Sequence, residues 1–317
     1  MKITVLDKCT LTMGDIDFSP IEALGEVSYY DILPHEEIIV AAKDAEVLLC
    51  NKAVIDADIM EKCKNLKYIG LFATGYNNIS IDEAKKRGII VVNVPGYSTY
   101  SVAQLTMAFI LSHATSLHSY NESTHSGEWI KSYAFSYFPY PMTELFGKTL
   151  GVYGMGAIGR KVAECAKTLG MNVIASTRTV RDNDYEYVGV DELFKRSDYL
   201  TLHAPLTEQN RELVCKRTLS LMKPTAYLIN TSRGGVINEA DLIDALNSGK
   251  IAGAAIDVAT TEPMKEGDPL LDAKNLIITP HVAWATPEAR RRLVDIVAKN
   301  LECFMNGAPQ NCVNLGE

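Results

Sequence analysis

Three polar residues that could do chemistry follow apolar stretches where strands are expected to end. Arg233 comes after the run 228–230, Glu262 after the run that ends at Val258, and His281 after Ile278 and two further residues. In open parallel α/β sheets the carboxyl ends of the strands line the ligand crevice, so all three side chains could meet one ligand. Each also has an ordinary interpretation, as a surface charge before a turn, a solvated loop acid or a hydrogen-bonded imidazole. Together, an Arg, a Glu and a His at three strand ends predict an active site.

A glycine pattern upstream indicates which ligand this edge binds. Gly154, Gly156 and Gly159 form G-x-G-x-x-G between a strand expected over 148–152 and a helix expected over 157–169. Such a turn lets the backbone approach a pyrophosphate closely and directs free helix N–H groups and the positive dipole end at it. Three glycines alone could serve only a tight turn, but the order of strand, glycines and helix favours dinucleotide binding.

The residues after the next expected strand bear on which dinucleotide is used. An NAD-binding fold of this kind carries Asp or Glu about 20 residues past the glycine motif, where it accepts hydrogen bonds from the ribose hydroxyls. Thr177 stands near that place (177 − 159 = 18 residues after Gly159), Arg178 follows it, and no acid appears before Asp182. This arrangement leaves room and positive charge for a 2′-phosphate and favours NADP. Arg178 could also stack on the adenine and let either cofactor bind.

The elements that must position these residues alternate along the chain. In the N-terminal part, strands are expected at 3–6, 47–50, 68–72 and 89–94, and helices at 38–45, 59–63 and 81–87. Ser80 and Glu83 are expected to form a capping box on the last of these helices. The second part continues with strands at 172–175, 199–203, 226–230, 251–258 and 276–279, and helices at 239–247 and 287–304. Asn238 should cap the helix at 239–247 and Gly249 should end it. This alternation predicts an α/β fold with two doubly wound parallel-sheet domains.

The length of 317 residues suits two domains with a cleft between them. We expect a discontinuous substrate-binding domain over 1–99 and 286–317, and a dinucleotide-binding domain over 100–285. A helix expected over 101–120 is apolar on most faces and must be covered by its own domain or also by a second subunit. The aromatic stretch 129–140 is either a packed loop or an arm across a dimer interface, and the sequence alone favours neither.

Composition narrows the class of protein. Apolar residues make up 47% and charged residues 22%, as in a soluble globular protein, and the net charge is 31 − 39 = −8. A negative charge argues against a general nucleic-acid or anionic-membrane surface. The seven cysteines are scattered without a C-x-x-C, so we expect reduced, mostly buried thiols in a cytoplasmic protein. No signal peptide, membrane-spanning run or metal-binding pattern is expected.

Five ordered motifs resemble those of the D-isomer-specific 2-hydroxyacid dehydrogenases. They are the glycine motif, His203–Thr207, Asn230–Gly235, Asp257 through Glu262-Pro263, and Thr279–Trp284. The tail from His281 to Asn314 is most similar to the glycerate dehydrogenase/hydroxypyruvate reductase branch. The resemblance covers nearly the whole chain and implies a flavodoxin-like substrate domain and a Rossmann NAD(P)-binding domain.

The resemblance also implies roles for individual residues. Arg233 would bind the substrate carboxylate and polarise its carbonyl, and His281 would donate the proton in reduction and accept it in the reverse reaction. Glu262 would hold the imidazole and favour its charged form. The backbone amides of Ala73, Thr74 and Gly75 would bind the substrate carboxylate, and Asp257 would lie beside the nicotinamide carboxamide. The full expected set of cofactor-binding residues is Gly154, Met155, Gly156, Ala157, Ile158, Gly159, Thr177, Arg178, His203, Ala204, Pro205, Thr231, Ser232 and Asp257.

The expected activity is the reduction of a short 2-keto acid, hydroxypyruvate or glyoxylate, to the D-2-hydroxy acid. NADPH is the favoured cofactor, NADH remains possible, and a homodimer is the expected assembly. Two alternatives stay open. One is another D-2-hydroxyacid dehydrogenase, of the phosphoglycerate or D-lactate type. The other is a nucleotide-sensing, corepressor-like interaction protein that keeps the same fold and triad.

Overall fold

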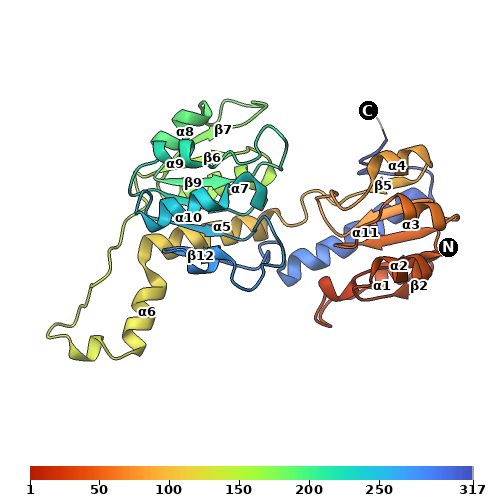
Figure 1. Ribbon diagram of the computed structural model, residues 1–317, viewed down its shortest axis with the longest axis horizontal. Coiled ribbons are helices and arrows are strands. Elements are labelled where there is room, and N and C mark those ends of the chain that lie inside the picture. The colour runs from red at the N-terminus through yellow and green to blue at the C-terminus, as the bar shows by residue number, and fades with distance from the viewer. Residues whose placement is uncertain (316–317) are drawn as a thin grey trace. The chain divides into compact units, whose positions relative to one another are not determined.

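A computed structural model describes residues 1–315, which form two compact units (Figure 1). The terminal unit consists of Met1–Ser98 and the chain from Ala285 onward, and the central unit is Thr99–Trp284. Both observed boundaries lie one residue before those expected from the sequence. Each unit is a parallel sheet with helices on both faces, which confirms the predicted fold class.

The terminal unit contains a parallel sheet in the order β2-β1-β3-β4-β5, the flavodoxin-like order. Its strands are β1 (Lys2–Val5), β2 (Glu26–Tyr29), β3 (Val47–Cys50), β4 (Tyr68–Leu71) and β5 (Ile90–Val92). Its helices are η1 (Lys8–Thr10), α1 (Ser19–Glu22), α2 (His35–Ala42), α3 (Ala57–Lys62), α4 (Ile81–Lys86) and α11 (Pro287–Met305). The last helix thus belongs to the same unit as the first strands, and it contacts α1 and β4.

The central unit contains a parallel sheet in the order β12-β11-β10-β9-β6-β7-β8, so strand order reverses between β6 and β9. Its strands are β6 (Thr149–Tyr153), β7 (Asn172–Ser176), β8 (Glu186–Tyr187), β9 (Tyr199–Leu202), β10 (Tyr227–Asn230), β11 (Gly253–Ile256) and β12 (Leu276–Ile278). Its helices are α5 (Thr99–Thr115), α6 (Leu117–His125), η2 (Trp129–Lys131), α7 (Ala157–Thr168), α8 (Val190–Arg196), α9 (Lys216–Leu221), η3 (Gly234–Val236), α10 (Glu239–Asn247) and η4 (Pro269–Asp272). In a Rossmann sheet the dinucleotide lies at the reversal point, which here is the β6/β9 edge.

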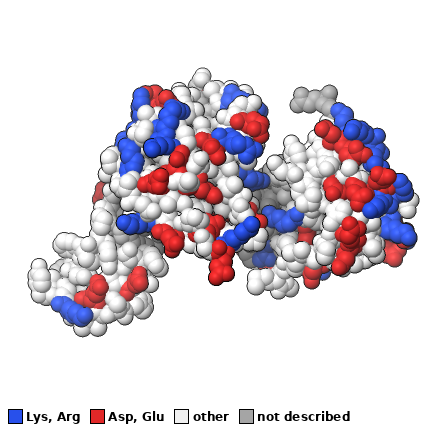
Figure 2. All heavy atoms as spheres, viewed as in Figure 1, with Lys and Arg blue, Asp and Glu red and all other residues white. Residues whose placement is uncertain are grey.

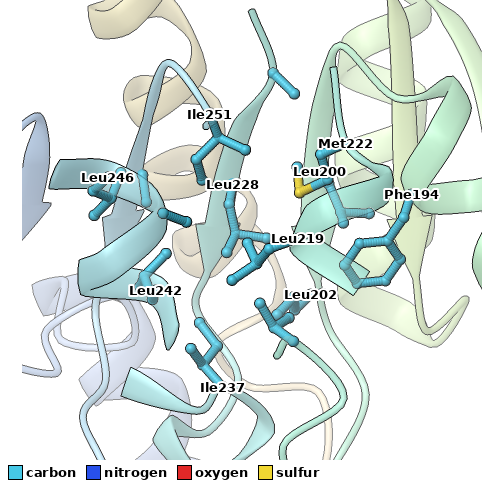
Figure 3. Close-up of a cluster of buried hydrophobic side chains, with 14 of the residues drawn as sticks. Phe194, Leu200, Leu202, Leu219, Met222, Leu228, Ile237, Leu242, Leu246 and Ile251 are labelled. Carbon is cyan, nitrogen blue, oxygen red and sulfur yellow. The ribbon is translucent and has the colours of Figure 1, made fainter. Parts of the chain in front are cut away.

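Two apolar layers hold this sheet between its helices. On one face, helices α5 and α7 pack on β6, β7 and β10, with Val152, Val162 and Ile229 fully buried. On the other face, α8, α9 and α10 cover side chains such as Leu200 and Leu228 (Figure 3). Side chains of a strand alternate between faces, so neighbours Leu228 and Ile229 enter different layers. This two-sided burial keeps the carboxyl ends of the strands in register as a rigid edge.

Several local predictions are wrong. The helix expected over 101–120 is divided into α5 and α6 at Ser116, which has a positive φ of 48°. The capping box on α4 does not form, because the Ser80 side chain makes no capping hydrogen bond. Leu169, the last residue of the helix expected over 157–169, lies just past the end of α7 and is 40% exposed. Edge strand β2 lacks an apolar run, and the sequence did not predict it.

Other local predictions are confirmed. The Asn238 side chain accepts a hydrogen bond from the Asp241 amide at 3.1 Å, and Gly249 adopts the left-handed conformation just past α10. All seven cysteines are free thiols, but only Cys50 and Cys63 are fully buried, so the expectation of mostly buried thiols is wrong.

Candidate active site

The glycine motif forms the turn between β6 and α7. Gly154 has a φ of 98°, and a side chain there would lie 2.6 Å from the Ala204 amide nitrogen, so the turn and the β9 end approach too closely for any other residue. At Gly159 a side chain would meet the Gly154 carbonyl oxygen, which keeps the helix close to the strand. Gly156 is the N-cap of α7, and because it has no side chain, none of the first N–H groups of the helix is capped by it. A side chain at this position would meet only open space. The start of α7 is therefore open at Gly156, as an anion-binding helix start requires.

A second observation at this edge fits a bound dinucleotide. The Nε2 atom of His203 is buried and has no hydrogen-bond partner among the described residues, and its Nδ1 lies 3.5 Å from the Thr231 hydroxyl. Thr231 in turn lies 3.2 Å from the Thr106 hydroxyl of α5. Burial lowers the pKa of His203 to about 3, so this imidazole is neutral at ordinary pH. It can therefore bind a polar group but cannot serve as the protonated acid of a reaction.

His281 and Glu262 come together from different loops. The Nδ1 atom of His281 lies 2.7 Å from the Glu262 Oε2, and the side chains are 26% and 37% exposed. The other carboxylate oxygen of Glu262 accepts a hydrogen bond from the Ala259 amide at 2.9 Å. An ionised carboxylate can only accept, so the hydrogen lies on Nδ1. The Nε2 atom of His281 forms no hydrogen bond or ion pair within residues 1–315 and can face a substrate.

Asp257 holds the loop that carries His281. Its carboxylate, which is 1% exposed, accepts hydrogen bonds from the Thr279 hydroxyl at 2.5 Å and from the Val282 and Ala283 amides at 2.9 Å each. His281 itself has a φ of 55°, in a region that residues other than glycine rarely adopt. Such a conformation costs on the order of 1–3 kcal/mol and persists only where its surroundings enforce it. The buried carboxylate supplies that constraint, a role that the sequence did not reveal.

Arg233 lies on a turn organised by Asn230, the last residue of β10. The buried Asn230 side chain accepts hydrogen bonds from Ser232 and donates one to the Arg233 carbonyl at 2.9 Å. The exposed Arg233 guanidinium donates to the Ser232 carbonyl at 2.7 Å through Nη1. A side chain at Gly234 would lie 2.0 Å from the Ala259 carbonyl carbon, so this turn packs directly against the loop that leads to Glu262. The three predicted catalytic residues thus lie on loops at the carboxyl ends of the strands, and Glu262 and His281 are hydrogen-bonded to each other.

The loop expected to bind a substrate carboxylate belongs to the terminal unit and follows β4. The Thr74 hydroxyl donates to the Val94 carbonyl at 2.7 Å, the Ala73 carbonyl accepts from the Val94 amide at 2.9 Å, and the Asn93 side chain donates to the Thr74 carbonyl at 2.7 Å. In the part of the chain that the structure describes, the amides of Thr74 and Gly75 donate to no protein group. The loop is therefore anchored through its oxygens while two N–H groups remain available to an anion.

The β7 end is much less constrained. The Ser176 carbonyl accepts a hydrogen bond from the Gly154 amide at 2.8 Å. Thr177, the next residue, therefore lies beside the glycine turn. Thr177 is half-buried and Arg178 and Arg181 are exposed, and within residues 1–315 none of their side chains forms a hydrogen bond or an ion pair. Asp182, the next acid, instead pairs with Arg160 of α7.

Neither a metal cluster nor a membrane-spanning helix occurs in the described part of the chain. Among residues 1–315, no group of three or more His, Cys, Asp and Glu side chains is placed to hold a metal ion. In the same residues, the helices are too short or too polar to cross a membrane.

Similarity to known proteins agrees with this geometry. Residues 107–283 match the family model described as D-isomer specific 2-hydroxyacid dehydrogenase, NAD binding domain. A hydroxypyruvate reductase of Blautia hydrogenotrophica is 42% identical, over 99% of this chain and 100% of that protein. A glycerate dehydrogenase of Methylorubrum extorquens is 40% identical, over 88% of each chain.

A solved structure shares the architecture as well. The TT0316 protein from Thermus thermophilus superposes with a TM-score of 0.89 at 33% identity, over 99% of this chain and 100% of that one. The family model covers more than half of the chain, including the glycine turn and all three candidate catalytic residues. The chain therefore belongs to the D-isomer-specific 2-hydroxyacid dehydrogenases, a family of oxidoreductases with a nicotinamide-dinucleotide-binding domain.

Proposed function

We propose that this protein reduces hydroxypyruvate or glyoxylate to the corresponding D-2-hydroxy acid, with NADPH as the preferred cofactor. The observation that carries the proposal is the His281–Glu262 pair at 2.7 Å, on the sheet edge that also presents the glycine turn and Arg233. The relatives named for hydroxypyruvate reduction and glycerate oxidation support this substrate class.

The proposed roles follow from the chemistry of each side chain. When the nicotinamide cofactor is bound, it supplies the hydride. Glu262 holds the imidazole of His281 through the hydrogen bond at Nδ1, and Nε2–H would donate the proton to the carbonyl oxygen of the keto acid. In the oxidative direction the same Nε2 accepts the hydroxyl proton.

Arg233 and the β4 loop would fix the substrate. The planar guanidinium can bind a carboxylate through two parallel hydrogen bonds and polarise the adjacent carbonyl. The amides of Thr74 and Gly75 would bind the same carboxylate. The terminal unit would then be the substrate-binding domain and the central unit the dinucleotide-binding domain.

The dinucleotide would lie along the β6/β9 edge. Its pyrophosphate would lie over Gly154–Gly159 at the start of α7. The nicotinamide half would meet the strand-end residues His203, Ala204, Pro205, Thr231, Ser232 and Asp257. Thr177 and Arg178 would receive the adenosine ribose, and the absence of an acid at Thr177 is what supports NADPH.

The test is a panel of 2-keto acids assayed with both reduced cofactors by loss of nicotinamide absorbance. We expect hydroxypyruvate or glyoxylate to give the highest kcat/KM, with NADPH above NADH. Higher kcat/KM for pyruvate or a bulky 2-keto acid would assign the protein to another substrate class of the same family. A higher kcat/KM with NADH would reject the proposed cofactor.

We also infer that the protein is a homodimer joined through an arm at residues 117–141 of the central unit. In Figure 1 this arm, formed by α6 and the segment after it, extends away from the sheet of its own unit. Its own hydrogen bonds shape it, including Tyr120 to the Tyr140 carbonyl at 2.7 Å and Trp129 to the Phe135 carbonyl at 3.0 Å.

Despite that internal order, the arm exposes large apolar side chains. Tyr133 is 104% exposed, Phe135 92% and Phe138 76%, which supports an arm over a packed loop. The arm is mostly uncharged on the face seen in Figure 2. An apolar, ordered projection of this kind is typical of a protein interface. Light scattering should give a dimer mass that falls to the monomer mass in Phe135→Glu/Phe138→Glu, and a monomeric wild-type protein would reject the inference.

A further inference from the structure

The charged groups beside the β7 end include one carboxylate that should oppose a 2′-phosphate. Residues 177–183 contain two cations, Arg178 and Arg181, and a single acid, Asp182. Because β7 ends beside the glycine turn, this segment starts where the adenosine ribose of a dinucleotide is expected. An unpaired carboxylate in the segment would repel a phosphate on that ribose.

Asp182 is held by contacts that turn it toward α7 and β8. Its Oδ1 accepts hydrogen bonds from the Asp184 amide and the Tyr187 hydroxyl, each at 3.1 Å, and its Oδ2 pairs with the Nη1 of Arg160. The Asp182 and Arg160 side chains are 23% and 28% exposed. The amide of Asp184 and the guanidinium of Arg160 lower the pKa of Asp182, and the carboxylate raises the pKa of Arg160. The pair is therefore ionised and neutral as a whole.

Arg160 lies between the two parts of the expected nucleotide site, the glycine turn and the segment that follows β7. It directly follows Gly159, the last glycine of the motif, and it lies in the first turn of α7. Arg160, Arg178, Arg181 and Asp182 together carry three positive charges and one negative charge, a sum of +2. Of these three cations, Arg160 pairs with Asp182, whereas the side chains of Arg178 and Arg181 form no hydrogen bond or ion pair with another described residue. Without Arg160, the charge of Asp182 would not be neutralised by an ion pair and would act on the neighbouring arginines and on a phosphate bound near them.

We propose that Arg160 is a positioning residue for cofactor choice, which pairs with Asp182 and so keeps that carboxylate away from Arg178, Arg181 and the 2′-phosphate of NADP. The inference rests on the proposed preference for NADPH. It adds one requirement to those of the glycine motif and Thr177, namely that the Asp182 carboxylate be paired. Its mechanism is indirect, because Arg160 acts through Asp182 and needs no contact with the phosphate.

The test is equilibrium binding of NADP⁺ and NAD⁺, measured by calorimetry, to wild type, Arg160→Met, Asp182→Asn and the double variant. The two ligands differ only in the 2′-phosphate. In Arg160→Met we expect affinity for NADP⁺ to fall about five- to tenfold relative to NAD⁺, the size of one screened charge interaction. In the double variant the ratio should return to within about twofold of wild type, since the carboxylate that Arg160 neutralises is gone.

Two results would overturn the inference. If the double variant binds NADP⁺ as weakly as Arg160→Met, then Arg160 contacts the phosphate itself. If Arg160→Met weakens both ligands equally, then the pair serves only to stabilise the fold. The proposed NADPH preference is tested separately: it fails if the wild-type protein binds NAD⁺ more tightly than NADP⁺. Even then, the change in the ratio of NADP⁺ to NAD⁺ affinity between wild type and the variants can still be measured.

Two further variants control for the loss of charge and of packing. Lys161→Met removes the adjacent cation of α7, which pairs with Glu164, and should leave the ratio unchanged. Arg160→Lys keeps the charge beside Asp182 and should recover most of the NADP⁺ affinity. A Lys161→Met variant that shifts the ratio as much as Arg160→Met would show a general charge effect and reject the specific pair.

Discussion

Two regions at the carboxyl ends of the strands in the central unit differ in how firmly the chain holds their side chains. We call them the β11/β12 edge and the β7 edge. At the β11/β12 edge, Asp257 accepts three hydrogen bonds from the loop of His281, and Glu262 uses one oxygen on a backbone amide and the other on the imidazole. At the β7 edge, the Thr177, Arg178 and Arg181 side chains make no hydrogen bond or ion pair within residues 1–315.

The difference reflects two kinds of task. Proton transfer depends on placing one nitrogen within hydrogen-bond reach of one oxygen, so its residues must be held before the substrate arrives. Discrimination between NADP and NAD depends on the sign of the charge near one ribose hydroxyl, which exposed arginines can provide without a fixed protein partner. Substitutions at the first edge should therefore change the rate, and those at the second should change only which cofactor is used.

The largest effect is expected for His281→Ala. Loss of the proton donor should lower kcat for keto-acid reduction on the order of 10²–10⁴-fold, as for other general acids. Because the imidazole does not hold the nucleotide, calorimetric affinity for NADP⁺ should stay within about twofold of wild type. If the variant keeps more than a tenth of the wild-type kcat, another group donates the proton. His203 is not suited to that role, because it is buried and neutral.

Arg233→Lys should have the next largest effect. A lysine keeps the charge but cannot bind a carboxylate through two parallel hydrogen bonds, so KM for the keto acid should rise about tenfold or more. Cofactor affinity should not change. A near-normal KM would show that the amides of Thr74 and Gly75 bind the carboxylate without help from Arg233.

Thr177→Asp tests the second edge. A carboxylate at this position can accept the ribose hydroxyls and repel the 2′-phosphate, so the ratio of kcat/KM for NADPH over NADH should fall about tenfold, with kcat for the preferred cofactor little changed. Thr179→Asp places the same charge two residues further along the exposed segment and serves as the control. Equal shifts in both variants would mean that overall charge, and not position 177, sets the preference.

The smallest effect is expected for Glu262→Gln. The amide oxygen can still accept from the Nδ1 of His281, but the hydrogen bond is no longer charge-assisted and holds the ring less firmly. A loss of about 1 kcal/mol should lower kcat for keto-acid reduction about fivefold, with affinity for NADP⁺ unchanged. Glu266→Gln alters an exposed acid of the same loop and should leave kcat unchanged. A wild-type kcat in Glu262→Gln would show that the charge of Glu262 is not needed to hold the ring.

Much of this protein could be predicted from local sequence patterns. Apolar runs and helical spacing placed most strands and the α7, α10 and α11 helices within a few residues, because periodicity is a property of short windows. The glycine turn and the polar residues Arg233, Glu262 and His281 were also predictable, since strand ends of a parallel sheet share one edge. The break at Ser116 was not, because an apolar helical pattern continues across it.

The sequence by itself determined the two α/β units, the glycine turn and the residue types at the proposed catalytic site. Only the tertiary structure decided that Asp257 holds the loop of His281, that the aromatic side chains of the arm point outward, and that Asp182 pairs with Arg160. Asp182 and Arg160 are separated by 22 residues and a strand (182 − 160 = 22), and their side chains meet only because β6 and β7 are neighbours in the sheet. Local patterns specify which elements form, whereas contacts between distant side chains depend on strand order and on the direction in which each chain leaves its strand.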